Sequence, residues 1–185
     1  MVVGRLETVD VTRFEQMVLP HLDAAYTLAR YLTRDRDDAD DVVQEAAFRA
    51  IRYFHTLRKD NPREVRAWLF SIVRRVYMTT YADRRHTATA SVSLDEPTLQ
   101  LVDPHEAPDA AAEHALVRER VQAAVDRLPD VLREVVVLRE VEQCSYQEIA
   151  TITSVPIGTV MSRVSRARAR LAVMLRGMIE TGDMQ

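Results

Sequence analysis

The chain has 185 residues, of which 47% are hydrophobic and 29% charged, as in ordinary globular proteins with one medium-sized or two small cores. A formal net charge of -3 argues against a protein that coats nucleic acid indiscriminately, and no window has the apolar length that crosses a bilayer. Acidic residues near the N-terminus exclude a secretory signal, and the single cysteine, Cys144, excludes an intrachain disulfide, so we expect a cytoplasmic protein.

The N-terminal part of the sequence predicts amphipathic helices. Apolar residues at three- and four-residue spacings predict a helix over 11–33, which Pro20 bends or divides. A second helix is predicted to begin in the aspartate cluster at 35–41, whose acids suit a helix N-terminus, and to continue to Phe54. A third follows Pro62.

The helix after Pro62 has two chemically different faces. At 100° per residue, the face predicted to be buried contains Val65, Trp68, Leu69, Ile72, Val76 and Thr80. The opposite face contains Arg74, Met78, Tyr81 and Arg85. Arginine and aromatic side chains suit nucleic acid, and they equally suit an ordinary solvated surface.

Residues 87–112 differ in composition from the helices on either side. They contain three prolines and several acids, with little apolar periodicity, which indicates a linker between units that fold separately. The sequence therefore predicts an all-α protein with two small helical domains, 1–86 and 113–185, joined by an acidic flexible linker, 87–112. Helical patterning resumes after the linker.

Residues 145–171 predict a helix-turn-helix. Ser145 and Glu148 have the S-x-x-E form of a capping box, which starts a helix of about two turns. The stretch "TSVP" ends that helix, and Pro156 suits the first position of a longer one. A short helix, a tight turn and a longer helix form the motif that places its second helix in the major groove of DNA.

The longer helix separates apolar and basic side chains. Val160, Val164, Ala167 and Leu171 share one face, whereas the opposite side contains Thr159, Ser162, Arg163, Arg166 and Arg170. A helix that reads DNA needs this division, because arginine donates two hydrogen bonds to guanine and also binds phosphates. Arg168 lies elsewhere and is expected to meet phosphate or an acidic neighbour. The alternative is a surface helix whose arginines confer solubility, or reflect a GC-rich genome.

Two parts of the chain resemble extracytoplasmic-function (ECF) sigma factors of bacterial RNA polymerase. Region four of that family resembles the C-terminal part, through Leu128-Pro129, Arg133, "SYQEIA" and "GTVMSRVSRARARL". Region two resembles the N-terminal part, through "DADDVVQEAAFRAI" and "REVRAWLFSIVRR". Both resemblances occur in the family's order, are separated by a linker and together cover most of the chain.

The resemblance implies three binding surfaces. The clamp coiled coil of the largest polymerase subunit would bind Asp41, Gln44, Glu45 and Phe48. The minus-ten element would be opened and read by Arg58, Lys59, Asn61, Trp68, Arg74 and Arg75. The minus-thirty-five element would be read by the basic side of the last helix, which contains Thr159, Ser162, Arg163, Arg166 and Arg170. Trp68 also suits a core position, and the aspartates also suit capping of their helix.

Three positions depart from the family pattern. Arg75 stands where an asparagine commonly holds a flipped base, and Thr79 stands where an aspartate is common. Met161 replaces a frequent lysine or arginine, which removes one backbone contact. These departures leave the promoter preference open.

The resemblance therefore predicts a sigma factor that binds core RNA polymerase, recognises promoter DNA and promotes its melting. Implied partners are the polymerase clamp, the flap of the second-largest subunit and an anti-sigma factor, with no cofactor and no insertion into the membrane. The alternative is a helix-turn-helix regulator that binds operators without joining polymerase. An enzyme is disfavoured, because the five histidines are scattered without metal-ligand spacing and the sequence lacks a nucleophile elbow and a Gly-rich phosphate loop.

Overall fold

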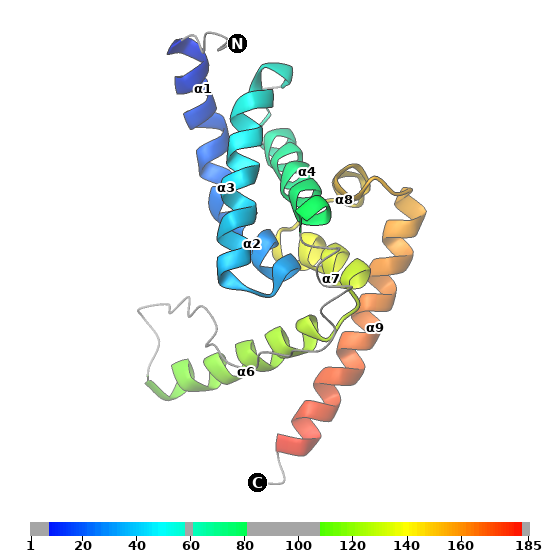
Figure 1. The fold of residues 1–185 in the computed structure, drawn as a ribbon. Helices are drawn as coiled ribbons and strands as arrows, with labels where there is room; N and C mark the ends of the chain where they lie inside the picture. The colour runs from blue at the N-terminus through cyan, green and yellow to red at the C-terminus, as the bar shows by residue number, and fades with distance from the viewer. Residues whose placement is uncertain (1–7, 58–60, 81–107, 183–185) are drawn as a thin grey trace.

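The computed structural model describes the backbone of residues 8–57, 61–80 and 108–182, and these ranges contain helices and no strand. The N-terminal unit, residues 8–80, contains α1 (Thr8–Val18), a 3₁₀ turn (Leu19–His21), α2 (Leu22–Thr33), α3 (Arg36–Tyr53), a second 3₁₀ turn (Phe54–Thr56) and α4 (Pro62–Thr80) (Figure 1). The C-terminal unit, residues 108–182, contains α6 (Pro108–Asp126), α7 (Asp130–Val136), a π-helical turn (Val137–Val141), α8 (Tyr146–Thr153) and α9 (Ile157–Gly182). The predicted all-α fold is confirmed.

Local signals explain where the first helices begin and end. Pro20 lies in the 3₁₀ turn between α1 and α2, because its ring removes the N–H that a continuous helix would use. The chain turns after α2 through Arg34, which has a left-handed φ of 61°. The carboxylate of Asp35 then accepts a hydrogen bond from the N–H of Asp38 at 2.9 Å. The predicted helix start in the aspartate cluster is therefore confirmed.

Helices α2, α3 and α4 pack against one another to form the core of the N-terminal unit. The buried face of α3 consists of small side chains, Ala39, Val42, Ala46 and Ala50. Small side chains let neighbouring helices approach closely, because the distance between packed helices depends on the residues at the contact. Larger side chains from α2 and α4, among them Leu28, Leu32 and Leu69, fill the remaining space.

The buried face of α4 differs from the predicted one. Val65, Leu69 and Val76 are buried as predicted, but Trp68 and Ile72 lie half-buried at the edge of the core. Their places are taken by Phe70, Val73 and Tyr77, each at most 1% exposed. The difference arises because α4 also contacts the C-terminal unit, so its buried surface extends around the helix.

Helix α6 begins earlier than the C-terminal domain predicted at 113–185. Its first residue, Pro108, lies inside the stretch predicted to be a linker, 87–112, while residues 81–107 lie outside those that the structure describes. A proline suits the first turn of a helix, because the N–H that it lacks would have no partner there. Figure 1 shows α6 and α9 diverging from the vicinity of α7.

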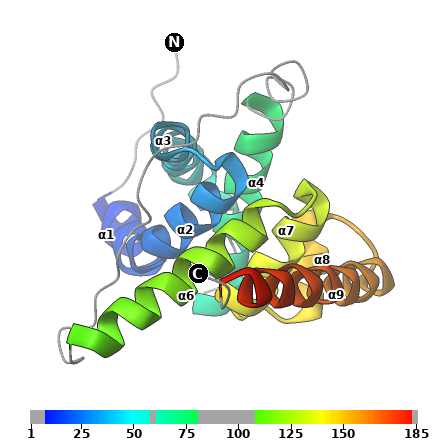
Figure 2. The same ribbon diagram turned by 90° about the horizontal axis from the view of Figure 1, so that it is seen from below.

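The two units pack directly against each other. α4 contacts α8, and α2 lies beside α7 (Figure 2). The buried side chains of both units form one continuous hydrophobic cluster. The sequence predicted units that fold separately, and its local patterns gave no indication of this interface. None of the helices within the described ranges has the length and hydropathy of a membrane span.

Candidate nucleic-acid interface

The helix-turn-helix contains the predicted capping box. The N–H of Glu148 donates to Ser145 Oγ at 3.2 Å, and the N–H of Ser145 donates to Glu148 Oε2 at 2.6 Å. Partial burial raises the pKa of Glu148, but the hydrogen bonds from Ser145 outweigh it, so the pKa of this carboxyl lies below its usual value. The first helix, α8, therefore begins directly after the predicted capping residue, Ser145.

A left-handed turn joins α8 to α9. Ser154 has a φ of 55°, and its N–H donates to the carbonyl of Ala150. Pro156 stands one residue before α9 rather than inside it, and its carbonyl accepts from Thr159 N–H at 2.9 Å and from Val160 N–H at 3.1 Å. Before α8, Arg139 of the π-helical turn donates to the carbonyl of Cys144 at 2.8 Å. This contact holds the residue that directly precedes the capping residue Ser145.

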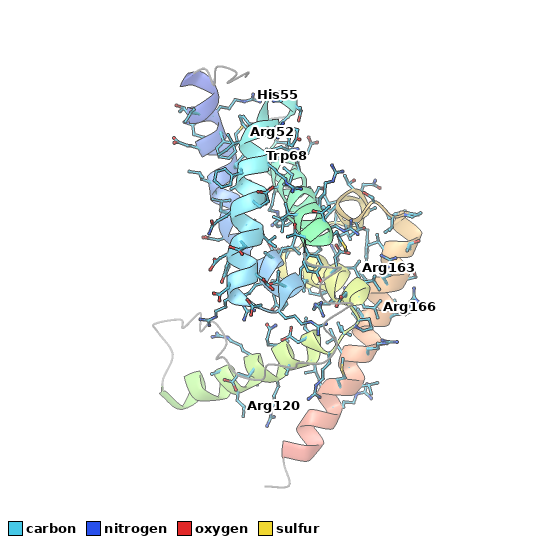
Figure 3. The ribbon with its side chains drawn as sticks, viewed as in Figure 1. Arg52, His55, Trp68, Arg120, Arg163 and Arg166 are labelled. Carbon is cyan, nitrogen blue, oxygen red and sulfur yellow. The ribbon has the colours of Figure 1, made fainter. Side chains whose placement is uncertain are left out.

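The two predicted faces of α9 are present. Val160, Val164 and Ala167 are at most 1% exposed and anchor the helix to α7 and α8. On the other side Ser162 and Arg166 are exposed, and the Arg166 guanidinium donates to the carbonyl of Ser162 at 3.3 Å (Figure 3). The exposed basic side starts within the first two turns of α9, where a major-groove helix contacts bases.

The remaining members of the predicted set differ in their surroundings. Thr159 and Arg163 are half-buried. Burial raises the pKa of Glu134 in α7, and the positive charges of Arg74 and, to a smaller extent, Arg163 oppose this rise. Arg170 lies further along α9 and lines a groove beside α6. Arg168 was expected to meet either phosphate or an acidic neighbour. It donates to Glu140 through two nitrogens, at 2.6 and 2.9 Å, so its partner in the structure is an acidic residue.

The residues predicted to read the minus-ten element fall into several environments. Arg75 is exposed on α4, whereas Arg74 donates through Nε to Glu134 Oε1 at 2.5 Å. Asn61 is exposed, but its Oδ1 accepts from the N–H of Arg63 at 3.0 Å and so caps α4. Trp68 is half-buried against the core, and Arg58 and Lys59 lie outside the described residues.

The residues predicted to bind the polymerase clamp form a stripe on α3. All four members are exposed and recur at helical spacing: Asp41, Gln44, Glu45 and Phe48. The Phe48 side chain is 69% exposed, which is unusual for a large aromatic residue. Glu45 accepts from Arg49 at 2.7 Å. Aromatic side chains are enriched at protein-binding surfaces, so the exposed Phe48 ring is consistent with such a role for the stripe.

A buried arginine, Arg133, connects the two units. The sequence pattern alone had not assigned it a role. Arg133 of α7 is fully buried and donates to the carbonyl of Tyr31 in α2 at 2.7 Å, to the carbonyl of Leu128 at 3.1 Å and to Asp130 at 2.6 Å. Arg34 donates to the same carbonyl of Leu128 and to the same Asp130. Sequence reasoning identified Arg133 only as a family landmark, because its partner in α2 is 102 positions away.

A second set of contacts joins α4 to the C-terminal unit. Arg66 donates to the carbonyl of Glu142 at 2.7 Å and contacts Sγ of Cys144 at 3.8 Å. Burial raises the pKa of Glu142 and of Glu134, while the arginines beside them oppose the effect. Burial also raises the pKa of the Cys144 thiol to about 11. Within the described ranges no three histidine, cysteine or acidic side chains are grouped to hold a metal ion.

Comparison with protein families identifies both units. Residues 17–87 match the model of Sigma-70 region 2, and residues 118–171 match that of Sigma-70, region 4. The chain is 30% identical over 183 residues to RNA polymerase sigma-H factor of Pseudomonas aeruginosa, covering 96% of this chain and 93% of that one. It is 36% identical over 171 residues to ECF RNA polymerase sigma factor SigM of Mycobacterium tuberculosis, covering 91% and 80%.

The chain spans less than two thirds of one relative. The match to ECF RNA polymerase sigma factor SigE of Mycolicibacterium smegmatis is 30% identical and spans 85% of this chain but 60% of that protein.

Two solved structures resemble the fold. The sigma factor RpoE of Bartonella quintana, in complex with the anti-sigma factor NepR, gives a TM-score of 0.69 at 27% identity, covering 88% of this chain and 96% of that one. CnrH in complex with the cytosolic domain of CnrY gives 0.62 at 27% identity, covering 89% and 88%.

Proposed function

Since the chain belongs to the ECF RNA polymerase sigma factors, we propose that it performs promoter recognition through separate surfaces of its two units. The chain is a promoter-recognising sigma factor. The observation that carries the proposal is the exposed basic side of α9, presented by a capped helix-turn-helix. We assign the chain no catalytic centre and no cofactor, and we place it in the cytoplasm with the polymerase.

Helix α9 reads the minus-thirty-five element. Ser162 and Arg166 are exposed near the start of the helix, where side chains reach base edges in the major groove. Thr159 and Arg163 complete the surface closest to α8. Arg170, two turns after Arg163, contacts the phosphate backbone and contributes affinity rather than sequence preference.

Helix α4 and the loop before it bind the minus-ten element. Arg74 and Arg75 supply positive charge on α4, with Trp68 at the edge of the core and Asn61 directly before the helix. The proposed set also includes Arg58 and Lys59, which lie outside the described residues. Arginine and aromatic side chains bind unpaired bases by stacking and by contacts to phosphate. Arg75 and Thr79 replace the family's common asparagine and aspartate, so the minus-ten base preference is left open.

The α3 stripe of Asp41, Gln44, Glu45 and Phe48 binds the polymerase clamp. Its support is the 69% exposure of Phe48 and the surrounding carboxylates, which complement a basic partner. An aromatic side chain that is exposed in the free protein and buried in a complex typically provides a large share of the binding energy.

The groove between α9 and the residues that directly follow α6 receives the flap of the second-largest polymerase subunit. It has a volume of about 410 Å³ and is lined by Arg127, Leu128, Ala169, Arg170, Val173 and Met174. Val173 is 71% exposed, and Leu116, Val117 and Val121 of α6 add further exposed apolar surface. An amphipathic helix lays its apolar face into such a groove, which supports this assignment.

The surfaces of both units are also available to an anti-sigma factor. The two structural neighbours were solved with NepR and with the cytosolic domain of CnrY, respectively. We infer that this chain is likewise held inactive by a partner of that kind, which covers the same surfaces as polymerase and DNA.

Reconstituted transcription tests the proposed function. Purified chain is mixed with core RNA polymerase, the complex is isolated by gel filtration, and transcripts from a genomic promoter library are sequenced at their start sites. We expect co-elution and transcripts that share two upstream elements, both lost when the chain is omitted. Specific DNA binding without polymerase association would instead identify an operator-binding regulator.

A further inference from the structure

Two large apolar side chains are exposed at the start of α9. Ile157 is 44% exposed and Met161 is 52% exposed. Their positions differ by four, which places them next to each other on one side of the helix. Figure 1 shows the first turns of α9, in orange, at the outer edge of the molecule beside α8. The helix that we assign to the minus-thirty-five element therefore presents an exposed apolar pair, Ile157 and Met161.

The apolar pair continues the surface that we assign to DNA. A Cβ placed on Gly158 would meet no heavy atom within 4 Å beyond its chain neighbours and its own helix backbone, so the space beside the pair is open. Ser162 directly follows Met161, is exposed and donates from Oγ to the carbonyl of Thr159 at 2.9 Å. Apolar and polar side chains thus stand next to each other on the first turns of α9, where a major-groove helix contacts bases.

The apolar side of α9 differs in chemistry from its basic side. Met161 stands where members of the family frequently have lysine or arginine, and a thioether has no hydrogen to donate to a phosphate. Arg168 lies about two helical turns further along the same side and donates to Glu140 at 2.6 and 2.9 Å. Its guanidinium is thus held by a carboxylate of the same unit. This side of α9 therefore suits an apolar contact with DNA rather than a contact with phosphate.

The base edges in the major groove of DNA offer one apolar group, the 5-methyl group of thymine. The groove is about 12 Å wide, and a helix with its side chains is about 10–12 Å across, so more than one side of the helix faces base edges. Methionine is flexible and polarizable, and it adapts its shape to the group that it contacts. A methyl group packed against Ile157 and Met161 leaves water, which favours thymine over a base without that methyl group.

We propose that Ile157 and Met161 recognise a thymine of the minus-thirty-five element through its 5-methyl group. The proposal rests on the proposed function, which assigns α9 to that element. Ser162 and Arg166 form hydrogen bonds with neighbouring base pairs, so the specificity of α9 combines polar contacts on one side with an apolar contact on the other. The replacement of a basic residue by Met161 then exchanges affinity for the DNA backbone for a preference for one base.

The experiment removes thymine methyl groups from the DNA. Core polymerase is reconstituted with the full-length chain and binds a fluorescent duplex carrying a promoter found in the transcription assay. Deoxyuridine, which lacks only the 5-methyl group, replaces the thymines of the minus-thirty-five element on both strands, first together and then one at a time. A control duplex has deoxyuridine at as many thymines between the two elements. Fluorescence anisotropy gives each Kd at one fixed salt concentration, because affinity for DNA depends on salt.

We expect the Kd of the unmodified chain to rise about fourfold at one thymine, as for the exposure of one methyl-sized group, and to stay unchanged for the control duplex. Met161→Ala should bind the thymine duplex about fourfold more weakly and should not distinguish it from the deoxyuridine duplex. Met161→Leu, which stays apolar and large, should keep the distinction. Val131→Ala is the matched control, because Val131 is 47% exposed on α7, and it should retain both the affinity and the distinction. Circular dichroism verifies folding.

Three results would overturn the proposal: a minus-thirty-five element without thymine on either strand, equal affinity of the unmodified chain for the thymine and deoxyuridine duplexes, or a methyl effect that persists in a folded variant combining Ile157→Ala and Met161→Ala. A duplex with a scrambled minus-thirty-five element separates these results from a failure of the proposed function. Co-elution with polymerase and weaker binding of the scrambled duplex, combined with any of the three, would refute methyl recognition and retain the sigma function. Loss of co-elution by the unmodified chain would refute the proposed function itself.

Discussion

Arg133 of α7 is fully buried and donates its Nε–H to the carbonyl oxygen of Tyr31 in α2, 2.7 Å away. This contact places a charged side chain from the C-terminal unit against the backbone of the N-terminal unit. Its other nitrogens donate to Leu128 and Asp130, so the guanidinium is satisfied on several sides.

Replacement of Arg133 by Met should destabilise the protein. The change leaves the carbonyls of Tyr31 and Leu128 without this donor inside the protein, and we expect the free energy of unfolding to fall by about 2–4 kcal/mol. Urea denaturation measures it. Arg49→Met, which removes an exposed pair with Glu45, is the control and should cost less than about 1 kcal/mol. Equal losses would contradict the role assigned to Arg133.

The capping box predicts a smaller and local effect. Ser145→Ala removes the acceptor for the N–H of Glu148, and we expect a loss of about 1 kcal/mol in the free energy of unfolding. Thr151→Ala, an exposed substitution inside α8, is the control and should change stability by less than about 0.5 kcal/mol. Thermal denaturation of both variants distinguishes capping from general helix propensity. An unchanged free energy of unfolding for Ser145→Ala would contradict a stabilising role of the cap.

Phe48→Ala should separate binding from stability. Because the ring is 69% exposed, its removal should change the free energy of unfolding by less than about 0.5 kcal/mol. Affinity for core polymerase should fall about tenfold or more, as expected for an aromatic anchor. Surface plasmon resonance with immobilised polymerase measures this. Leu19→Ala changes another exposed apolar residue of the N-terminal unit, outside the α3 stripe, and should retain full affinity.

Arg166→Ala should weaken promoter binding without affecting assembly. The side chain is exposed on the basic side of α9, and a base contact from arginine contributes about 1–3 kcal/mol of discrimination. We expect about tenfold or greater loss in binding of the reconstituted holoenzyme to its promoter, with polymerase affinity unchanged. Ser165→Ala, exposed on a different side of α9, should bind normally. A uniform loss across unrelated sequences would indicate a phosphate contact instead.

The Cys144 thiol should make stability depend on alkaline pH. Its pKa is raised from 9.0 in the unfolded chain to about 11 in the folded protein. Between these values the unfolded state loses the proton first, so the free energy of unfolding falls as the pH rises, by at most about 1.4 kcal/mol per pH unit. Cys144→Ala should lack this contribution. Urea denaturation between pH 8 and 11 measures the difference, and identical slopes for both proteins would contradict the burial effect.

Local features of the site could be predicted from the sequence because their partners lie within a few residues. Ser145 and Glu148 are three positions apart, and the two faces of α9 repeat at helical spacing, so a single pattern specifies each of them. The start of α3 behind Asp35 depends on an equally short contact with Asp38.

The contacts between the units could not be predicted in this way. Arg74 and Glu134 are 60 positions apart, and each looks like an ordinary surface residue within its own helix. The buried face of α4 was partly mispredicted for the same reason, because Phe70 is buried and Trp68 only half-buried. Helical periodicity indicates that a face is apolar, but it does not indicate which other helix will cover it.

The 60-residue separation between Arg74 and Glu134 also affects the order of events during protein synthesis. Translation at about 5–20 residues per second delivers Glu134 to the growing chain about 3–12 seconds after Arg74. During this interval α4 has no C-terminal unit to pack against, so the nascent N-terminal unit has its basic side uncovered. Synthesis of α7 and α8 is therefore also the step that first covers this surface.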